Sequence, residues 1–178
     1  LNVMTTQLEK YVQSIFELYS NENAFHSFPL ACEALLRAHY MWEEWSSELS
    51  NDPWDHFMLL FAALIHGVKH CGVENSQLEA ENGMICAMYR GKKAYQQRNS
   101  FDCAFEALEE DFEELYEEIV FGCPNFRACV KKLVINFTYL ESKEMLSSLV
   151  GKFEEIMTKP SNTERTLKEQ REAKVGLV

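Results

Sequence analysis

Apolar residues recur every three or four positions along most of the chain, which is the spacing of one buried face on an α-helix. Such faces predict helices over residues 5–19, 29–49, 53–65, 77–89, 99–121, 126–137 and 145–157. Seven glycines and four prolines are too few for the many tight turns of a β-sandwich or barrel. The 178 residues are therefore predicted to form an all-α, compact multi-helix bundle.

The start of the helix predicted over residues 53–65 carries a capping signal. Asp52 can accept hydrogen bonds from N–H groups of the first turn, and Pro53 has the backbone angle that a first turn needs. Two histidines lie on this helix and the one before it. We expect His39 to pack beside Trp42, one turn away, and His56 to lie on the outer face in solvent.

A run of acidic residues covers one side of the helix predicted over residues 99–121. Its members are Glu106, Glu109, Glu110, Asp111, Glu113, Glu114, Glu117 and Glu118. We interpret this run as a solvated outer face. The net charge of −11 argues against a nucleic-acid ligand, because such ligands are bound through clustered lysines and arginines.

Several features of the sequence favour a cytoplasmic location. No apolar run is long enough to cross a bilayer, and residues 1–10 lack the basic and apolar regions of a secretory signal. The six cysteines lie in apolar surroundings, without the C-x-x-C pairs typical of zinc sites. We therefore expect reduced, buried thiols and no membrane partner.

The stretch most informative about function is residues 61–75, F-A-A-L-I-H-G-V-K-H-C-G-V-E-N. Apolar residues through Ile65 predict a helix buried on all sides, and the glycines that follow permit backbone angles that a side chain would resist. A helix that ends there aims His66 and His70 from a rigid support into a pocket.

This stretch resembles the metal-binding signature of the class I 3′,5′-cyclic nucleotide phosphodiesterases of the HD superfamily, A-L-x-H-D-x-x-H-x-G-x-x-N. The matched positions are Ala63, Leu64, His66, His70, Gly72 and Asn75. The resemblance implies that His66 is a metal ligand and that His70 and Asn75 line the pocket. Gly67 stands at the position of the family's aspartate ligand.

A second match lies in the loop before the helix predicted from Pro29. Residues 23–31, N-A-F-H-S-F-P-L-A, resemble the family's N-P-F-H-N-F-x-H-A. The resemblance places His26 at the position of the general acid, which protonates the leaving 3′ oxygen. Leu30 stands where the family has a histidine ligand, and a leucine side chain cannot coordinate a metal.

Further matches lie toward the C-terminus. Gln96 and Gln97 are the nearest equivalents of a glutamate that supports the family's metal site, and Tyr139 replaces an acidic residue of the metal pocket. The resemblance covers the N-terminal half of a family domain, so we expect a bundle truncated at its C-terminus. We divide the chain into a partial phosphodiesterase-like helical domain, residues 1–158, and a polar, mobile tail, residues 159–178.

The family's reaction uses two divalent metals, zinc and magnesium, which lower the pKa of a bridging water and neutralise charge on the phosphoryl oxygens. Two histidines and two aspartates hold these metals in the family. Leu30 and Gly67 replace two of the four ligands, the fourth is expected beyond residue 178, and His66 remains. A single imidazole holds no binuclear centre, so we expect weak metal binding or none.

Three functional hypotheses follow from this resemblance. The first is a phosphodiesterase-family domain with an impaired or inactive site, a pseudoenzyme in which His66 and His70 bond to each other or to carbonyl groups. The second is an active hydrolase of cAMP or cGMP in signal transduction, with a site completed by other residues or by another chain. The third is a regulatory module that forms a homo-oligomer or dimerises with an intact phosphodiesterase.

Overall fold

The computed structural model describes residues 2–23, 25–49 and 52–136, and within these ranges the chain forms eight α-helices and no β-strand. The helices are α1 (Asn2–Leu18), α2 (Phe28–Leu49), α3 (Pro53–Ile65), α4 (Asn75–Glu81), α5 (Met84–Met88), α6 (Tyr95–Asp111), α7 (Glu113–Gly122) and α8 (Phe126–Asn136). The prediction of an all-α fold is confirmed.

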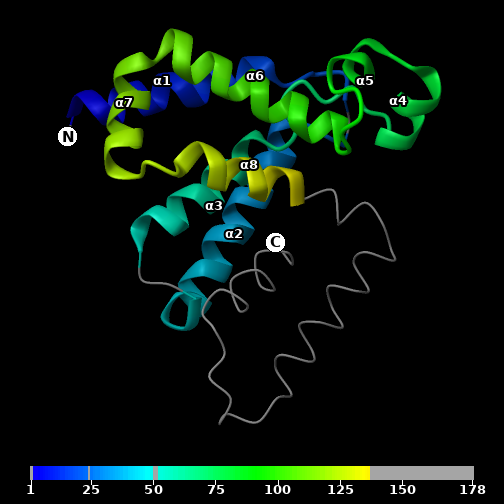
Figure 1. Cartoon of the computed structure of the whole chain (residues 1–178). Coiled ribbons are helices and arrows are strands. Elements are labelled where there is room, and N and C mark those ends of the chain that lie inside the picture. Colours follow the sequence, from blue (N-terminus) through cyan, green and yellow to red (C-terminus); the bar gives the residue numbers. More distant parts are fainter. Residues whose placement is uncertain (1, 24, 50–51, 137–178) are drawn as a thin grey trace, which may run out of the picture.

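The central helix is α3, which packs against α2 and α8 (Figure 1). Asp52 caps its first turn, because the carboxylate accepts the Trp54 N–H at 2.9 Å. Every residue from Phe61 to Ile65 is buried, as the continuous apolar run predicted. The Phe61 ring stacks on Tyr11 of α1 and meets Phe126 of α8 edge to face, so α3 holds the two sides of the bundle together.

The first helix presents the apolar face that its sequence predicted. Tyr11 and Ile15 are fully buried, and α1 packs against α6 and α7, which run along it in Figure 1. The Tyr11 hydroxyl donates a hydrogen bond to the Ala104 carbonyl of α6 at 3.0 Å. A buried phenol thus keeps a partner while its ring fills the core.

The single helix predicted over residues 77–89 is wrong, because the structure has two short helices there, α4 and α5. Asn82 adopts the left-handed conformation at φ 47° and ends α4, and Gly83 precedes α5. Asparagine tolerates this conformation better than most residues, so it serves as a helix stop.

The helix predicted over residues 99–121 is also two helices, and it begins earlier than predicted. The first-turn N–H of Gln96 donates to the Asn75 side chain at 2.9 Å, so the cap of α6 comes from a residue distant in sequence. Phe112, at φ −134° and ψ 44°, separates α6 from α7. The apolar stripe stays on the inside and the acidic face outside, where Glu109 pairs with Arg127.

Some expectations meet the structure only in part. All six cysteines are free, as expected, but the expectation of burial is wrong for Cys71, which is exposed, and holds fully for Cys86 alone. No helix in the described part of the chain is long and apolar enough to cross a membrane. The helix predicted over residues 145–157, Tyr139 and the division at residue 158 lie outside the described residues.

Candidate functional site

His66 lies directly after the last residue of α3, as the predicted helix end required. Its Nδ1 is 2.7 Å from the Ala63 carbonyl oxygen. Because a carbonyl only accepts, Nδ1 carries the proton and Nε2 keeps its lone pair. Burial lowers the pKa of the ring below its ordinary value, so His66 is neutral near pH 7.

His70 follows one turn later and is only 5% exposed. Its Nδ1 accepts the Gly72 N–H at 3.1 Å, which leaves the proton of the neutral ring on Nε2. Burial first, and then the neighbouring His26 and His66, lower the pKa of His70 to about 4. The local chain supports this pose, because Gly72 has φ +81°, a conformation that glycine adopts without strain.

The loop that carries His26 is held against His70 by one side chain, Asn23. The Asn23 carbonyl oxygen accepts the N–H groups of Phe25 at 3.2 Å and His26 at 2.9 Å, and its amide donates to the His70 carbonyl at 3.1 Å. The rings of His26 and His70 stack with centroids 3.5 Å apart. Burial and the nearby His66 lower the pKa of His26 as well.

The structure thus brings together the side chains of His26, His66 and His70, and we use the name histidine pocket for these three side chains alone. Because the rings of His26 and His70 stack at an interplanar angle of 23°, their nitrogen lone pairs lie in two separate, roughly parallel planes. Within the described residues, the ligand atoms of these three rings do not form a group within 4.8 Å of one another. At neutral pH the described side chains of this pocket offer a metal uncharged imidazoles.

The space beside Gly67, which the resemblance aligns with the family's aspartate, is occupied by Tyr19. A Cβ placed on Gly67 would lie 3.0 Å from Cε1 of the Tyr19 ring. The Tyr19 hydroxyl donates to the Leu64 carbonyl at 2.6 Å and accepts the Gly67 N–H at 3.3 Å. Sequence reasoning placed Tyr19 only on the apolar face of its helix, and no signal in the sequence pairs it with Gly67.

The other residues named from the resemblance lie as follows. Leu30 is partly buried in the first turn of α2. The Asn75 amide donates to the Gln97 side chain at 2.9 Å, and Gln96 bonds to Asn75 through its backbone. Asn75 therefore connects the two glutamines to the motif that contains His70, and its place in the pocket lining stays a prediction.

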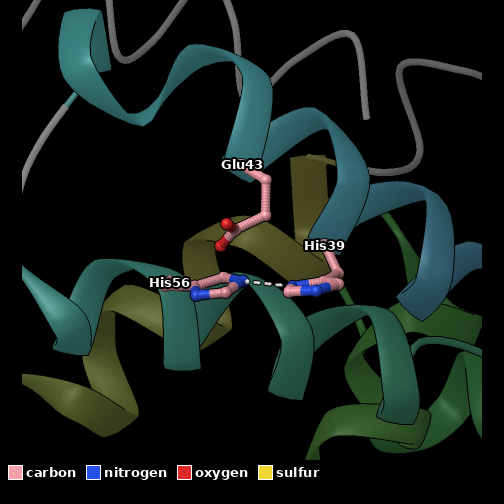
Figure 2. Close-up of side chains that lie close together, drawn as sticks. All are labelled: His39, Glu43 and His56. Carbon is pink, nitrogen blue, oxygen red and sulfur yellow. Dashed lines mark hydrogen bonds between the residues drawn. The ribbon is translucent and has the colours of Figure 1, made fainter.

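A second group of ligand-type side chains lies between α2 and α3, and sequence reasoning missed it. Figure 2 shows His39 and Glu43 of α2 facing His56 of α3, and one ligand atom from each lies within 4.8 Å of the other two. The expectation that His56 is solvated on the outer face is wrong. Its ring is partly buried and parallel to Trp42, with centroids 5.0 Å apart.

Comparison with known proteins identifies the class to which this fold and pocket belong. The model of the 3′5′-cyclic nucleotide phosphodiesterase family matches residues 25–177. A search of curated proteins finds no match. Because the family match covers most of the chain, the protein belongs to the 3′5′-cyclic nucleotide phosphodiesterase family.

Proposed function

We propose that this chain is a non-catalytic member of its family, which keeps the helical scaffold and has lost the hydrolysis of cyclic nucleotides. The observation that carries the proposal is the contact between Tyr19 and Gly67. A hydrogen-bonded aromatic ring lies 3.0 Å from the place that the Cβ of an aspartate at position 67 would take, so an aspartate there requires this ring to shift.

The charge of the histidine pocket supports the same proposal. Activating water for attack on a phosphodiester takes divalent cations, and such cations are held at these sites largely by carboxylates. Burial lowers the pKa of each of the three described rings, so they offer uncharged nitrogen ligands, and within the described residues no carboxylate joins them in a metal-ligand group. A lowered pKa also leaves His26 mostly unprotonated, which disfavours the role of general acid.

Hydrolysis of cAMP and cGMP by the purified 178-residue chain tests this proposal. The assay includes Mg²⁺, Mn²⁺ and Zn²⁺ in turn, and it compares the wild type with His66→Gln. We expect both proteins to give the background rate in every metal. A metal-dependent rate that the wild type shows and His66→Gln lacks would overturn the proposal.

A second candidate function is the regulatory interaction with an intact family member or with a second copy of this chain. The exposed apolar side chains of the short helix α5 favour it, because Met84 and Met88 lie one turn apart and are 81% and 64% exposed. Light scattering after size-exclusion chromatography, with and without an intact phosphodiesterase, measures this association. A wild-type elution that matches Met84→Gln/Met88→Gln under both conditions argues against it.

A further inference from the structure

The side chains of His39, Glu43 and His56, which we call the α2–α3 cluster, meet edge to edge rather than face to face. Nδ1 of His39 and Nε2 of His56 are 3.3 Å apart, whereas the ring centroids are 5.3 Å apart. The two nitrogens therefore point toward each other between the helices. In Figure 2 the Glu43 side chain reaches down from α2 toward the same two rings.

We propose that the α2–α3 cluster is a binding site for Zn²⁺ or a chemically similar late first-row divalent cation. The site lies outside the histidine pocket and does not depend on the function proposed above. Two imidazole nitrogens and one carboxylate oxygen are a typical three-ligand set for zinc, with a fourth position for water. Mg²⁺ and Ca²⁺ fit poorly, because both prefer all-oxygen ligands.

The separation of the two nitrogens suits a tetrahedral ion. Zinc binds imidazole nitrogen at about 2.0–2.1 Å, so two such ligands at the tetrahedral angle are about 3.3–3.4 Å apart. The observed separation of His39 Nδ1 and His56 Nε2 is 3.3 Å. An ion bound on the Glu43 side of this line requires both rings to rotate toward it about χ2, the torsion of the Cβ–Cγ bond. In histidine this torsion has a broad energy minimum.

The protonation states of the two rings are compatible with a bound ion. The shared contact uses Nδ1 of His39 and Nε2 of His56, so each ring has its other nitrogen for its own proton. An ion that binds here displaces the shared proton, and the ring that donated it takes up a proton from solvent on its other nitrogen, so both rings stay neutral and each offers a lone pair. Glu43 then supplies the negative charge that two imidazoles lack.

The surroundings hold the ligands in place. His39 and Glu43 are four residues apart on α2, so they lie on one face of the helix one turn from each other. The Trp42 ring lies parallel to His56 at an interplanar angle of 1°. Beneath the cluster, Ala38 of α2 packs against Leu59 and Ala63 of α3, which fixes the spacing of the two helices.

Metal titration of the complete chain tests this site. After chelation and removal of the chelator, we expect the wild type to bind Co²⁺ with the visible spectrum of a tetrahedral ion and to release it to Zn²⁺. His56→Gln and Glu43→Gln should each weaken Co²⁺ binding by more than about tenfold. His26→Gln, a change in the histidine pocket, should leave the spectrum and the affinity unchanged.

Two outcomes would overturn the proposal. One is equal Co²⁺ affinity in the wild type and His56→Gln, and the other is loss of the spectrum in His26→Gln. Unfolding of each variant in chelator shows whether it folds like the wild type. If His56→Gln does not fold, the decision falls to Glu43→Gln, whose side chain is exposed and is therefore replaced at little cost to the fold.

Discussion

The histidine pocket and the α2–α3 cluster contain similar ligands in different arrangements. In the histidine pocket, His26 and His70 stack face to face, and within the described residues no carboxylate joins the three rings in a metal-ligand group. In the α2–α3 cluster, two rings meet through their nitrogens beside a carboxylate. The difference teaches that the number of histidines does not define a candidate metal site, because ligand atoms close enough to share one ion and a balancing charge are both required.

The most direct test of this comparison is to add metal ligands to the histidine pocket. The variant Leu30→His/Gly67→Asp adds an imidazole and a carboxylate at the two positions that the resemblance aligns with the family's ligands. In a His56→Gln background, which removes the contribution of the α2–α3 cluster, we expect the Zn²⁺ affinity to rise by about 1,000-fold, or about 4 kcal/mol. Calorimetric titration measures the change, and Leu30→His alone serves as the control.

The same double variant should lose stability. The aspartate Cβ meets the Tyr19 ring, which is fixed by two hydrogen bonds, so the free energy of unfolding in chelator should fall by about 1–3 kcal/mol. Unchanged Zn²⁺ affinity in a folded double variant would count against the alignment of Leu30 and Gly67 with the family's ligands.

A second prediction uses the stability that a bound ion confers. At free Zn²⁺ about 100 times the dissociation constant, the free energy of unfolding of the wild type should rise by about 2.7 kcal/mol. His26→Gln should gain the same amount and His39→Gln almost nothing. Urea unfolding with and without Zn²⁺ measures the gain, and an equal gain in His39→Gln would place the ion elsewhere.

A third prediction concerns acid. The pKa of His70 is lowered from 6.5 to about 4 in the folded protein, so the unfolded chain binds more protons between these pH values. The neutral ring therefore stabilises the fold above pH 6.5, and this contribution is lost as the pH falls toward 4. We expect a loss on the order of 1–3 kcal/mol in chelator, and a shallower pH dependence in His70→Gln.

The smallest expected effect is at Tyr19. Tyr19→Phe keeps the ring and removes the hydroxyl that bonds to Leu64 and Gly67, so the free energy of unfolding should fall by about 1 kcal/mol. Tyr40→Phe is the matched control, because Tyr40 is 70% exposed. Equal unfolding curves for the two variants would show that the hydroxyl does not stabilise the end of α3.

Helices and caps that depend on residues within one segment could be predicted from the sequence. The buried faces of α1, α3 and α8 and the Asp52 cap follow from residue spacing and capping preference within one segment. The start of α6 could not be predicted in this way, because its cap is Asn75, which another part of the chain brings there. The helix therefore begins at Tyr95, whereas the sequence predicted a start at residue 99.

The candidate sites were also predictable from the sequence only in part. The resemblance pointed to His26, His66 and His70, and the structure brings these residues together. The resemblance did not predict the contact between Tyr19 and Gly67, because this contact joins two segments that are distant in the sequence. The position of His56 depends on how α2 crosses α3, but the spacing of His39 and Glu43 on one helical face was a signal that could have suggested a cluster.

The Tyr19 ring also bears on how such a protein changes over generations. A lineage that acquires an aspartate at position 67 must also accommodate the Tyr19 ring, whose hydroxyl bonds to the backbone of Leu64 and Gly67. Gly67→Asp alone crowds the Tyr19 ring, and loss of the tyrosine alone removes its two hydrogen bonds. Each change alone is therefore expected to lower the free energy of unfolding. An aspartate at position 67 is therefore expected to be accompanied by a shift or a replacement of Tyr19.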